Sequence, residues 1–363
     1  ELKIDMKFLE GFERGGKVGM VGISLIRMAK WLGIPAVAEG VETREQIDFL
    51  RTLGCDMIQG YYYSRPIPRE EFEAKLESNE SIVSKTDAPA AITVDNIAAG
   101  LYTAGGPRQI QQVLPTMEGA ATWHSMWKIA GPPKAAAGAN PPAYTVGSGY
   151  IPTRATAGAV GQANPTNSLF LAFLRARAAV VGTLILFDRV WACSGFATNT
   201  TSTQTVTTPG TLTAGRDPLS GLDVWPWIEI YTAPGATGAT WTLTGTDSTG
   251  TTGRTWTYAH PANAETAGQT APMLPGTAIG GCQVATSLAC SVSSGTAGDV
   301  GVTLRRELGS VSVTNAYMDA VVDFAQVGLP EIFDDACLET VWLASATTTV
   351  TVFGRLGLSE MTP

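Results

Sequence analysis

The residues with the clearest chemical potential lie near the start of the chain, in Ala36-Val37-Ala38-Glu39-Gly40-Val41-Glu42-Thr43. Two carboxylates, Glu39 and Glu42, follow an apolar run and stand three residues apart. Carboxylates at the carboxyl end of a parallel strand occupy the position where α/β barrels place their chemistry. A strand-to-helix turn with two solvated acids has the same pattern, so the spacing alone leaves both interpretations open.

The surrounding pattern predicts the elements that position these acids. Residues 2–5, 36–38 and 56–60 read as short strands, and residues 18–32, 45–53 and 69–76 as helices. Thr43 is placed to cap the second helix, and Gln46 to return the bond. Alternating strands and helices predict a parallel sheet. Three such units cannot close a barrel, so we expect an exposed sheet edge.

Two more blocks flank the first one: Leu2-Lys3-Ile4-Asp5, and Gly54-Cys55-Asp56-Met57-Ile58-Gln59-Gly60-Tyr61-Tyr62-Tyr63-Ser64-Arg65-Pro66. In this order and at these distances, the three blocks resemble the last third of an EAL domain, over residues 1 to about 77. That family hydrolyses the bacterial messenger cyclic-di-GMP on a TIM-like barrel. The resemblance implies that Lys3, Asp5, Glu39, Glu42 and Gln59 contribute to the metal site, the attacking water and nearby contacts.

Other parts of the family pattern are missing from this sequence. These are the Glu-Ala-Leu segment, the upstream Asn and Glu ligands, and the Asp-Asp-Phe-Gly stretch. A two-metal site needs carboxylates from several strands, so we expect the EAL-like residues to be inactive and to hold no metal. Mg²⁺ or Mn²⁺ would enter only if sequence before Glu1 completes a phosphodiesterase, and the start at Glu1 rather than methionine leaves that open.

Composition limits the other functions. A length of 363 residues predicts two or three domains, and the net charge of −8 argues against nucleic acid as a partner. No apolar run approaches the ~18 residues of a membrane span, and no signal peptide is evident. Five cysteines without a CxxC pair favour reduced, buried thiols, with a Cys282–Cys290 bridge as the alternative.

The composition divides the chain into parts. Residues 1–78 hold 11 Lys+Arg and 13 Asp+Glu, whereas no lysine follows Lys134 and the later region is rich in Gly, Ala and Thr. We therefore predict a truncated EAL-like βα fragment at 1–78, a linker at 79–95, an extended Gly/Pro/Ala-rich arm at 96–168, and a β-rich structural domain at 169–363.

Within the second part, Ser168–Val181 has the apolar spacing of a helix, and Leu184–Trp191 is an apolar strand that must be covered on both faces. We expect Phe187, Asp188, Arg189 and Trp191 to be structural. Because an unpaired buried Asp is costly, Arg189 or another arginine should neutralise Asp188. From residue 196 to 358, strands of period two between Gly/Thr/Ser/Pro turns predict a sandwich or jelly-roll-like domain.

No catalytic set is evident in the second part. His124 and His260 lack partners at metal-ligand spacing. Residues 96–360 resemble structural proteins of tailed bacteriophages, through strand and turn motifs. These motifs are Leu184–Trp191 with Ser194-Gly195, Thr251-Thr252-Gly253-Arg254-Thr255, Gly295-Thr296-Ala297-Gly298, and Gly301-Val302-Thr303-Leu304-Arg305-Arg306.

The sequence thus supports several hypotheses. The first is a phage particle component, such as a capsid, cement or decoration subunit, that carries an inactive EAL remnant. It would assemble with itself or other particle subunits, in a virion or in the bacterial cytoplasm, without nucleic acid or membrane as a partner. The alternatives are the C-terminal portion of a cyclic-di-GMP phosphodiesterase with a β-rich accessory domain, and an inactive EAL module that binds a nucleotide or protein. Enzyme activity is expected only in the phosphodiesterase case.

Overall fold

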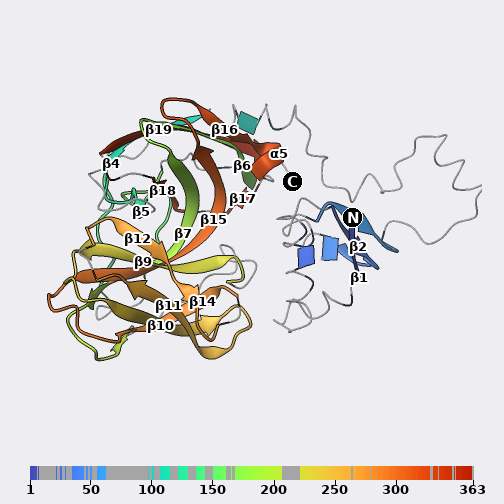
Figure 1. The fold of residues 1–363 in the computed structure, drawn as a ribbon. Coiled ribbons are helices and arrows are strands. Elements are labelled where there is room, and N and C mark those ends of the chain that lie inside the picture. Colours follow the sequence, from blue (N-terminus) through green and yellow to red (C-terminus); the bar gives the residue numbers. More distant parts are fainter. Residues whose placement is uncertain are drawn as a thin grey trace, which may run out of the picture. The chain divides into compact units, whose positions relative to one another are not determined.

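The computed structural model describes residues 1–5, 35–44, 55–62, 107–114, 122–129, 136–143, 150–160, 168–206, 221–262, 265–278, 280–327, 330–333, 335–345 and 349–361, with a few single positions between them. The chain divides into two compact units (Figure 1). The N-terminal unit comprises residues 1–92 and 363, and the β-rich unit comprises residues 93–362. No helix among the described residues is long and apolar enough to cross a membrane.

The N-terminal unit contains a small parallel sheet. Strands β1 (Leu2–Asp5), β2 (Ala36–Glu39) and β3 (Met57–Gln59) pair in that order. The residues described within 18–32 and 45–53 are helical, whereas the predicted helix at 69–76 and the linker at 79–95 lie outside the described residues. The parallel sheet is confirmed, but a partial (β/α) barrel of three βα units is not supported, because the described strands form an open sheet.

The turn after β2 has the predicted capping geometry. The Thr43 hydroxyl accepts from the Gln46 backbone N–H at 3.3 Å, and the Gln46 side-chain oxygen accepts from the backbone N–H groups of Thr43 and Glu42 at 3.0 and 2.7 Å. This reciprocal arrangement satisfies N–H groups that a helix start leaves free. Gly40 has a φ of 81°, which glycine adopts at little cost. The chain can therefore turn sharply just after Glu39.

The centre of the β-rich unit is a closed six-stranded barrel (Figure 1). Its strands, in order around the barrel, are β12 (Gln269–Pro272), β5 (Trp123–Ser125), β18 (Leu338–Ala344), β7 (Gly182–Ala197), β15 (Asp299–Val313) and β9 (Val224–Thr232). Closure gives every barrel strand two neighbours and removes the exposed edges that an open sheet presents.

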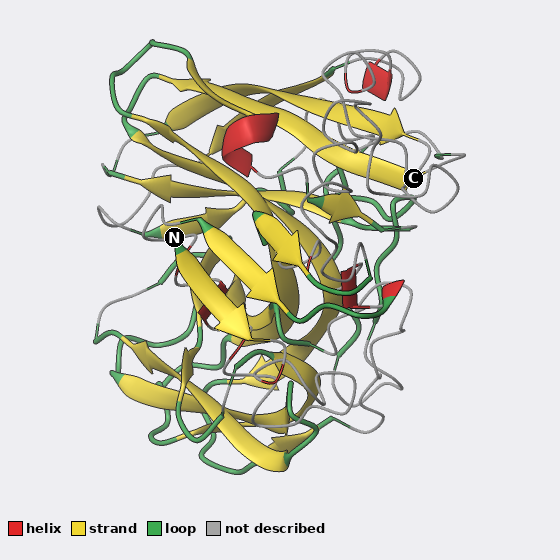
Figure 2. Cartoon of the chain, turned by 90° about the vertical axis from the view of Figure 1, so that its right-hand side faces the viewer, coloured by secondary structure: helices red, strands yellow, loops and turns green. Residues whose placement is uncertain are grey.

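Two five-stranded sheets flank the barrel, and strands dominate the picture in Figure 2. One sheet has the order β13 (Leu274–Pro275), β11 (Thr252–His260), β10 (Ala239–Asp247), β14 (Cys282–Cys290) and β8 (Gln204–Thr205). The other contains β16 (Ala320–Asp323), β6 (Ser168–Ala178), β19 (Val350–Met361) and β4 (Arg108–Leu114), with β17 (Glu331–Ile332) also pairing with β6; the short helix α5 (Phe324–Val327) follows β16. The β-rich prediction is confirmed, but the sandwich or jelly-roll arrangement is replaced by a barrel between two sheets.

The long strands β7 and β15 connect two separate hydrophobic cores. One core contains Leu184 and Leu186 of β7 together with residues of β4, β6 and β19. The other contains Trp191 and Phe196 of β7 together with residues of β9, β10, β11 and β14. Ile185 and Phe187 face a third cluster, with Trp227 and Val341. The prediction that this apolar strand is covered on both faces is therefore confirmed.

The predicted helix at Ser168–Val181 is wrong. Residues Ser168–Ala178 form strand β6, and Leu169, Leu171 and Leu174 pack into the first core while Phe170 and Phe173 pack on the opposite face. An apolar run of this kind fits either element, and its pairing along β19 decides for the strand. The segment predicted as an extended arm, 96–168, contributes β4 and β5 to the sheets. All five cysteines are free, so the Cys282–Cys290 bridge is not formed.

Candidate functional site

The predicted EAL-like residues gather at one edge of the N-terminal sheet. Asp5, Glu39 and Gln59 are the last residues of β1, β2 and β3, and they are direct register partners across the three strands. Since paired positions and positions two apart share a sheet face, Lys3 lies on the same face. The Lys3 Nζ donates to Glu39 Oε1 at 2.7 Å. This hydrogen bond is the first cause of the raised pKa of Lys3. Glu42 is exposed in the following turn.

These residues offer oxygen ligands of the kind that Mg²⁺ and Mn²⁺ prefer. Among the described residues, however, no group of three or more His, Cys, Asp or Glu side chains could hold a metal ion. One oxygen of Glu39 is also engaged by Lys3. The described donor set therefore does not fit a metal ion on its own, although it places two carboxylates, an amide and an amine at one strand-end edge.

A second polar site lies inside the barrel of the β-rich unit. Arg189 from β7, Arg305 from β15, Glu229 from β9 and Glu339 from β18 form a cluster of four side chains without solvent exposure. Arg189 Nη1 lies 2.7 Å from Glu229 Oε2 and 2.8 Å from Glu339 Oε2. Arg305 Nη2 lies 3.2 Å from Glu229 Oε2 and 2.6 Å from Glu339 Oε1. We call these four residues the barrel ion cluster.

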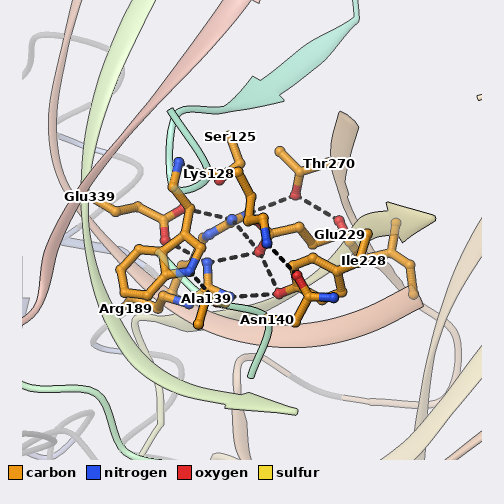
Figure 3. A network of polar contacts seen from close by, with 12 residues as sticks. Ser125, Lys128, Ala139, Asn140, Arg189, Ile228, Glu229, Thr270 and Glu339 are labelled. Atoms are coloured by element: carbon orange, nitrogen blue, oxygen red, sulfur yellow. Dashed lines mark hydrogen bonds and ion pairs between the residues drawn. The ribbon is translucent and has the colours of Figure 1, made fainter. Parts of the chain in front are cut away.

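Neighbouring polar groups extend the barrel ion cluster (Figure 3). The Tyr231 hydroxyl accepts from Arg189 Nη2 at 2.8 Å and donates to Glu229 at 3.1 Å. Burial raises the pKa of Tyr231 well above its usual value, so the phenol stays neutral. Arg305 donates to Thr270 Oγ1 at 2.7 Å, and that hydroxyl donates to the Ile228 carbonyl at 2.6 Å.

Aromatic rings cover the two guanidinium groups of the cluster. Arg189 Cζ lies 4.4 Å from the ring centroid of Trp127, and Arg305 Cζ lies 5.3 Å from that of Trp227. Trp127 is held in turn by its Nε1 donating to the Ala139 carbonyl at 2.9 Å. Two arginines and two glutamates balance in charge. The four buried side chains therefore neutralise one another inside the barrel.

The four predicted structural residues of β7 are all buried, and they have different partners. Asp188 is paired with another arginine: Arg306 Nη2 lies 3.5 Å from Asp188 Oδ2, and the two are register partners on β15 and β7. The backbone N–H of Cys337 donates to Asp188 Oδ1 at 2.9 Å. Arg189 pairs with Glu229 and Glu339, Phe187 meets Trp227 edge-on at 5.2 Å, and Trp191 lies in the second core.

Glu229, Glu339 and Arg305 were not among the predicted site residues. The available signal was a charged residue in the middle of an apolar strand, as in Ile228-Glu229-Ile230, because an acid on such a strand requires a buried partner. Nothing in the linear spacing indicates which strands meet in the barrel, so the partners could not be paired from the sequence.

The two histidines also lie in the β-rich unit and have different environments. His124 is buried, and burial lowers its pKa to about 4. His260 Nδ1 lies 2.7 Å from Glu265 Oε2, and its ring stacks on Trp241 at 4.9 Å. Glu265 also accepts from the Tyr258 hydroxyl and borders a cavity of about 380 Å³ between β9 and β12 on one side and β11 on the other. Among the described residues, neither histidine belongs to a group of three or more His, Cys, Asp or Glu side chains that could hold a metal ion.

Comparison with known proteins finds relatives for the N-terminal part of the chain. Residues 1–66 match the model of the EAL domain family. The chain is similar to the "Oxygen sensor protein DosP" of Escherichia coli, with 37% identity over 78 residues, which is 22% of this chain and 10% of that protein. It is also similar to the "Cyclic di-GMP phosphodiesterase RocR" of Pseudomonas aeruginosa, with 38% identity over 72 residues, 20% of this chain and 18% of that protein. The chain thus spans a fifth or less of these relatives.

Comparison of the structure gives a different and weaker result. The structure of the infectious bursal disease virus VP2 subviral particle aligns with this chain at 11% identity and a TM-score of 0.18. The alignment covers 76% of this chain and 84% of the VP2 chain. A TM-score this low carries no argument about fold or function. The similarity to EAL domains predicted for the first part is therefore found, and the similarity to phage proteins predicted for the second part is not supported.

Proposed function

We propose that residues 1–66 are the C-terminal portion of a cyclic-di-GMP phosphodiesterase domain, and that residues 93–362 are a β-rich accessory module. The match of residues 1–66 to the EAL domain carries this proposal. The sheet register supports it, because Asp5, Glu39 and Gln59 end adjacent strands at one edge. Strand ends of this kind are where barrel enzymes assemble their catalytic groups.

In this proposal residues 1–363 do not hydrolyse cyclic-di-GMP by themselves. The described side chains do not hold a metal ion alone, and activation of a water by two metals needs carboxylates from further strands. The strand-end residues would complete a site whose other ligands come from the preceding part of an EAL domain. Glu39 would act within that site, and Lys3 would orient its carboxylate through their hydrogen bond. The proposed location is the bacterial cytoplasm.

An exchange of segments tests the proposal. The 72-residue segment of the phosphodiesterase RocR that matches this chain would be replaced by the corresponding residues of this chain. We expect the chimera to hydrolyse cyclic-di-GMP in the presence of Mg²⁺ or Mn²⁺, and Glu39→Gln to abolish the linear product. Glu1→Gln is the matched control, because Glu1 precedes β1 at the other end of the sheet.

A folded chimera without turnover would contradict the proposal, as would a chimera in which Glu39→Gln and Glu1→Gln behave alike. The comparisons with known proteins do not support a phage-particle function. An inactive EAL module that binds a nucleotide remains the alternative within the same family.

A further inference from the structure

A cavity opens between the barrel and one flanking sheet of the β-rich unit. It has a volume of about 380 Å³ and lies between β9 and β12 of the barrel on one side and β11 on the other. Ala259 and Leu274 border it and are both exposed, so the cavity opens to solvent. A cavity of about 150 Å³ holds a benzene ring. The larger volume here therefore has room for a single ring with substituents.

The walls of this cavity are apolar. Side chains alternate along a strand, so Ile228 and Ile230 lie on the outer face of β9, opposite to Glu229. Ala271 of β12 is the register partner of Ile228, and its short side chain leaves space beside the isoleucines. Tyr258 lines the cavity from β11 and packs against the same core. Aliphatic groups and an aromatic ring thus enclose a space suited to a planar ring.

One end of the cavity is polar but balanced in charge. Glu265 lines it and is 6% exposed; its Oε1 accepts from the Tyr258 hydroxyl, and its Oε2 lies 2.7 Å from His260 Nδ1. The other ring nitrogen of His260, Nε2, lies 3.1 Å from the Gly235 carbonyl oxygen. A neutral imidazole has a single N–H, and both partners of His260 are acceptors, so the imidazolium form fits this position. Its positive charge offsets the carboxylate of Glu265.

The same polar end offers a donor and an acceptor to a ligand. Gln269 lines the cavity, is 7% exposed, and accepts from the Thr266 backbone N–H at 2.7 Å through its side-chain oxygen. This bond to the residue after Glu265 places the Gln269 amide next to the carboxylate. Among the described residues, nothing accepts a hydrogen bond from the Gln269 amide nitrogen, and a buried donor without a partner is costly. Each carboxylate oxygen of Glu265 has one of these partners and can accept a second hydrogen bond.

We propose that this cavity binds an uncharged single-ring compound that carries a hydroxyl group, of the phenol class. A hydroxyl group donates and accepts at one oxygen atom, so it can donate to Glu265 and accept from the Gln269 amide. The ring lies between the isoleucines of β9 and Tyr258, where burial of its apolar surface favours binding. A ligand with an amine or a carboxylate would bring an unpaired charge into a site whose own charges are balanced, which is costly.

The test is a ligand-observed NMR titration of the full chain at neutral pH with four probes of similar size: p-cresol, toluene, benzylamine and benzoate. We expect saturable binding of p-cresol, about tenfold or more tighter than that of toluene, because only its hydroxyl group satisfies Gln269 and Glu265. Benzylamine and benzoate, which are charged, should bind more weakly than p-cresol. The result does not depend on the proposed function, because the cavity lies in the β-rich unit and the titration measures no hydrolysis.

Three variants tie the binding to the cavity. Ala271→Leu fills the space beside Ile228 and should weaken p-cresol binding about tenfold or more. Gln269→Glu keeps an acceptor for the Thr266 N–H but replaces the donor by a negative charge, so it should weaken p-cresol binding and strengthen benzylamine binding. Gln283→Glu is the matched control, because it makes the same change on β14 outside the cavity, and it should leave all four affinities unchanged.

Absence of p-cresol binding to the folded chain would overturn the inference, as would toluene or either charged probe binding as tightly as p-cresol. Unchanged p-cresol affinity in folded Ala271→Leu would place the ligand elsewhere and also overturn it. If Ala271→Leu does not fold, Gln269→Glu decides: equal effects of Gln269→Glu and Gln283→Glu on p-cresol and benzylamine would contradict the proposed contacts.

Discussion

At the scale of single residues, the barrel ion cluster places four charges in the interior of the β-rich unit. Its four charged groups come from four different strands, and each is fully buried. Burying charges is costly, and removal of one partner leaves the others uncompensated in a medium of low dielectric constant. A single substitution in this cluster should therefore disturb the barrel more than the loss of any exposed ion pair.

We predict that Glu339→Gln lowers the free energy of unfolding of the chain by about 3–5 kcal/mol, because it leaves the two arginines with one carboxylate. Urea melts at neutral pH give this difference. Asp319→Asn is the matched control, since it breaks an exposed pair with Arg175, and exposed ion pairs contribute little to stability. Similar midpoints for the two variants would show that the cluster does not stabilise the barrel.

His124 gives the stability a defined pH dependence. Its folded pKa is about 4, below the unfolded value of 6.5. Between these two pH values the unfolded chain therefore binds more protons at His124 than the folded chain does. The stabilising contribution of neutral His124 is present above pH 6.5 and is lost as the pH falls towards 4. We predict that the stability difference between wild type and His124→Gln changes by up to about 3 kcal/mol between pH 7 and pH 4.

Melts of both proteins across this pH range measure the prediction. Comparison of the two proteins cancels the contributions of the carboxylates, which titrate in both. Burial lowers and the hydrogen bond to Glu265 raises the pKa of His260, with a net increase. Because both proteins contain His260, the comparison also cancels its contribution. A difference that stays constant from pH 7 to pH 4 would contradict the burial of a neutral His124.

At the scale of elements, β7 and β15 determine the architecture of the β-rich unit. They pair along thirteen positions, from Asp299 and Ala197 to Val313 and Gly182, and each contributes to both large cores. The register shifts three times along the pairing of β15 with β7, and such irregularities bend a strand pair. Each of the two strands therefore packs against both flanking sheets, one at each end of the barrel.

We predict that Phe187→Ala destabilises the β-rich unit by about 3–5 kcal/mol, because it leaves a cavity beside Trp227 and under Arg305. A urea melt of residues 93–363 with and without the substitution measures it. Val321→Ala, at a position that is 52% exposed, is the control and should change the free energy by about 0.5 kcal/mol or less. An unchanged midpoint for Phe187→Ala would mean that β7 is not part of the core.

At the scale of the whole molecule, the two units differ in how well they can bury their own sheets. The β-rich unit closes its central sheet into a barrel with a core on either side. The described N-terminal sheet has three short strands. Met57 lies on the sheet face that carries Lys3 and Glu39, and it is 44% exposed. A short segment buries a smaller fraction of its surface than a large domain does, so its stability margin is thin.

We therefore predict that residues 1–78 expressed alone show no cooperative thermal transition, whereas residues 93–363 unfold cooperatively with the urea midpoint they have in the full chain. Circular dichroism and fluorescence melts of the two pieces and of the full chain give the comparison. A sharp transition in the isolated N-terminal segment would show that it closes its sheet by a route that these strands do not indicate.

The sequence by itself determined the local features whose cause is local. The capping pair at Thr43 and Gln46, the parallel strands with acids at their ends, the covered strand from Leu184 to Trp191, and an arginine partner for Asp188 all follow from residue types and short spacings. The EAL similarity was likewise carried by three short blocks, and the family comparison finds it at residues 1–66.

The tertiary structure decided which distant segments meet. Ser168–Ala178 has an apolar pattern that suits a helix or a strand, and only the ladder along β19 makes it β6. Glu229, Glu339, Arg189 and Arg305 come from four strands between residues 182 and 344, and barrel closure alone brings them within hydrogen-bonding distance. Contacts at such separations depend on strand order and register, which are properties of the complete sheet rather than of any segment.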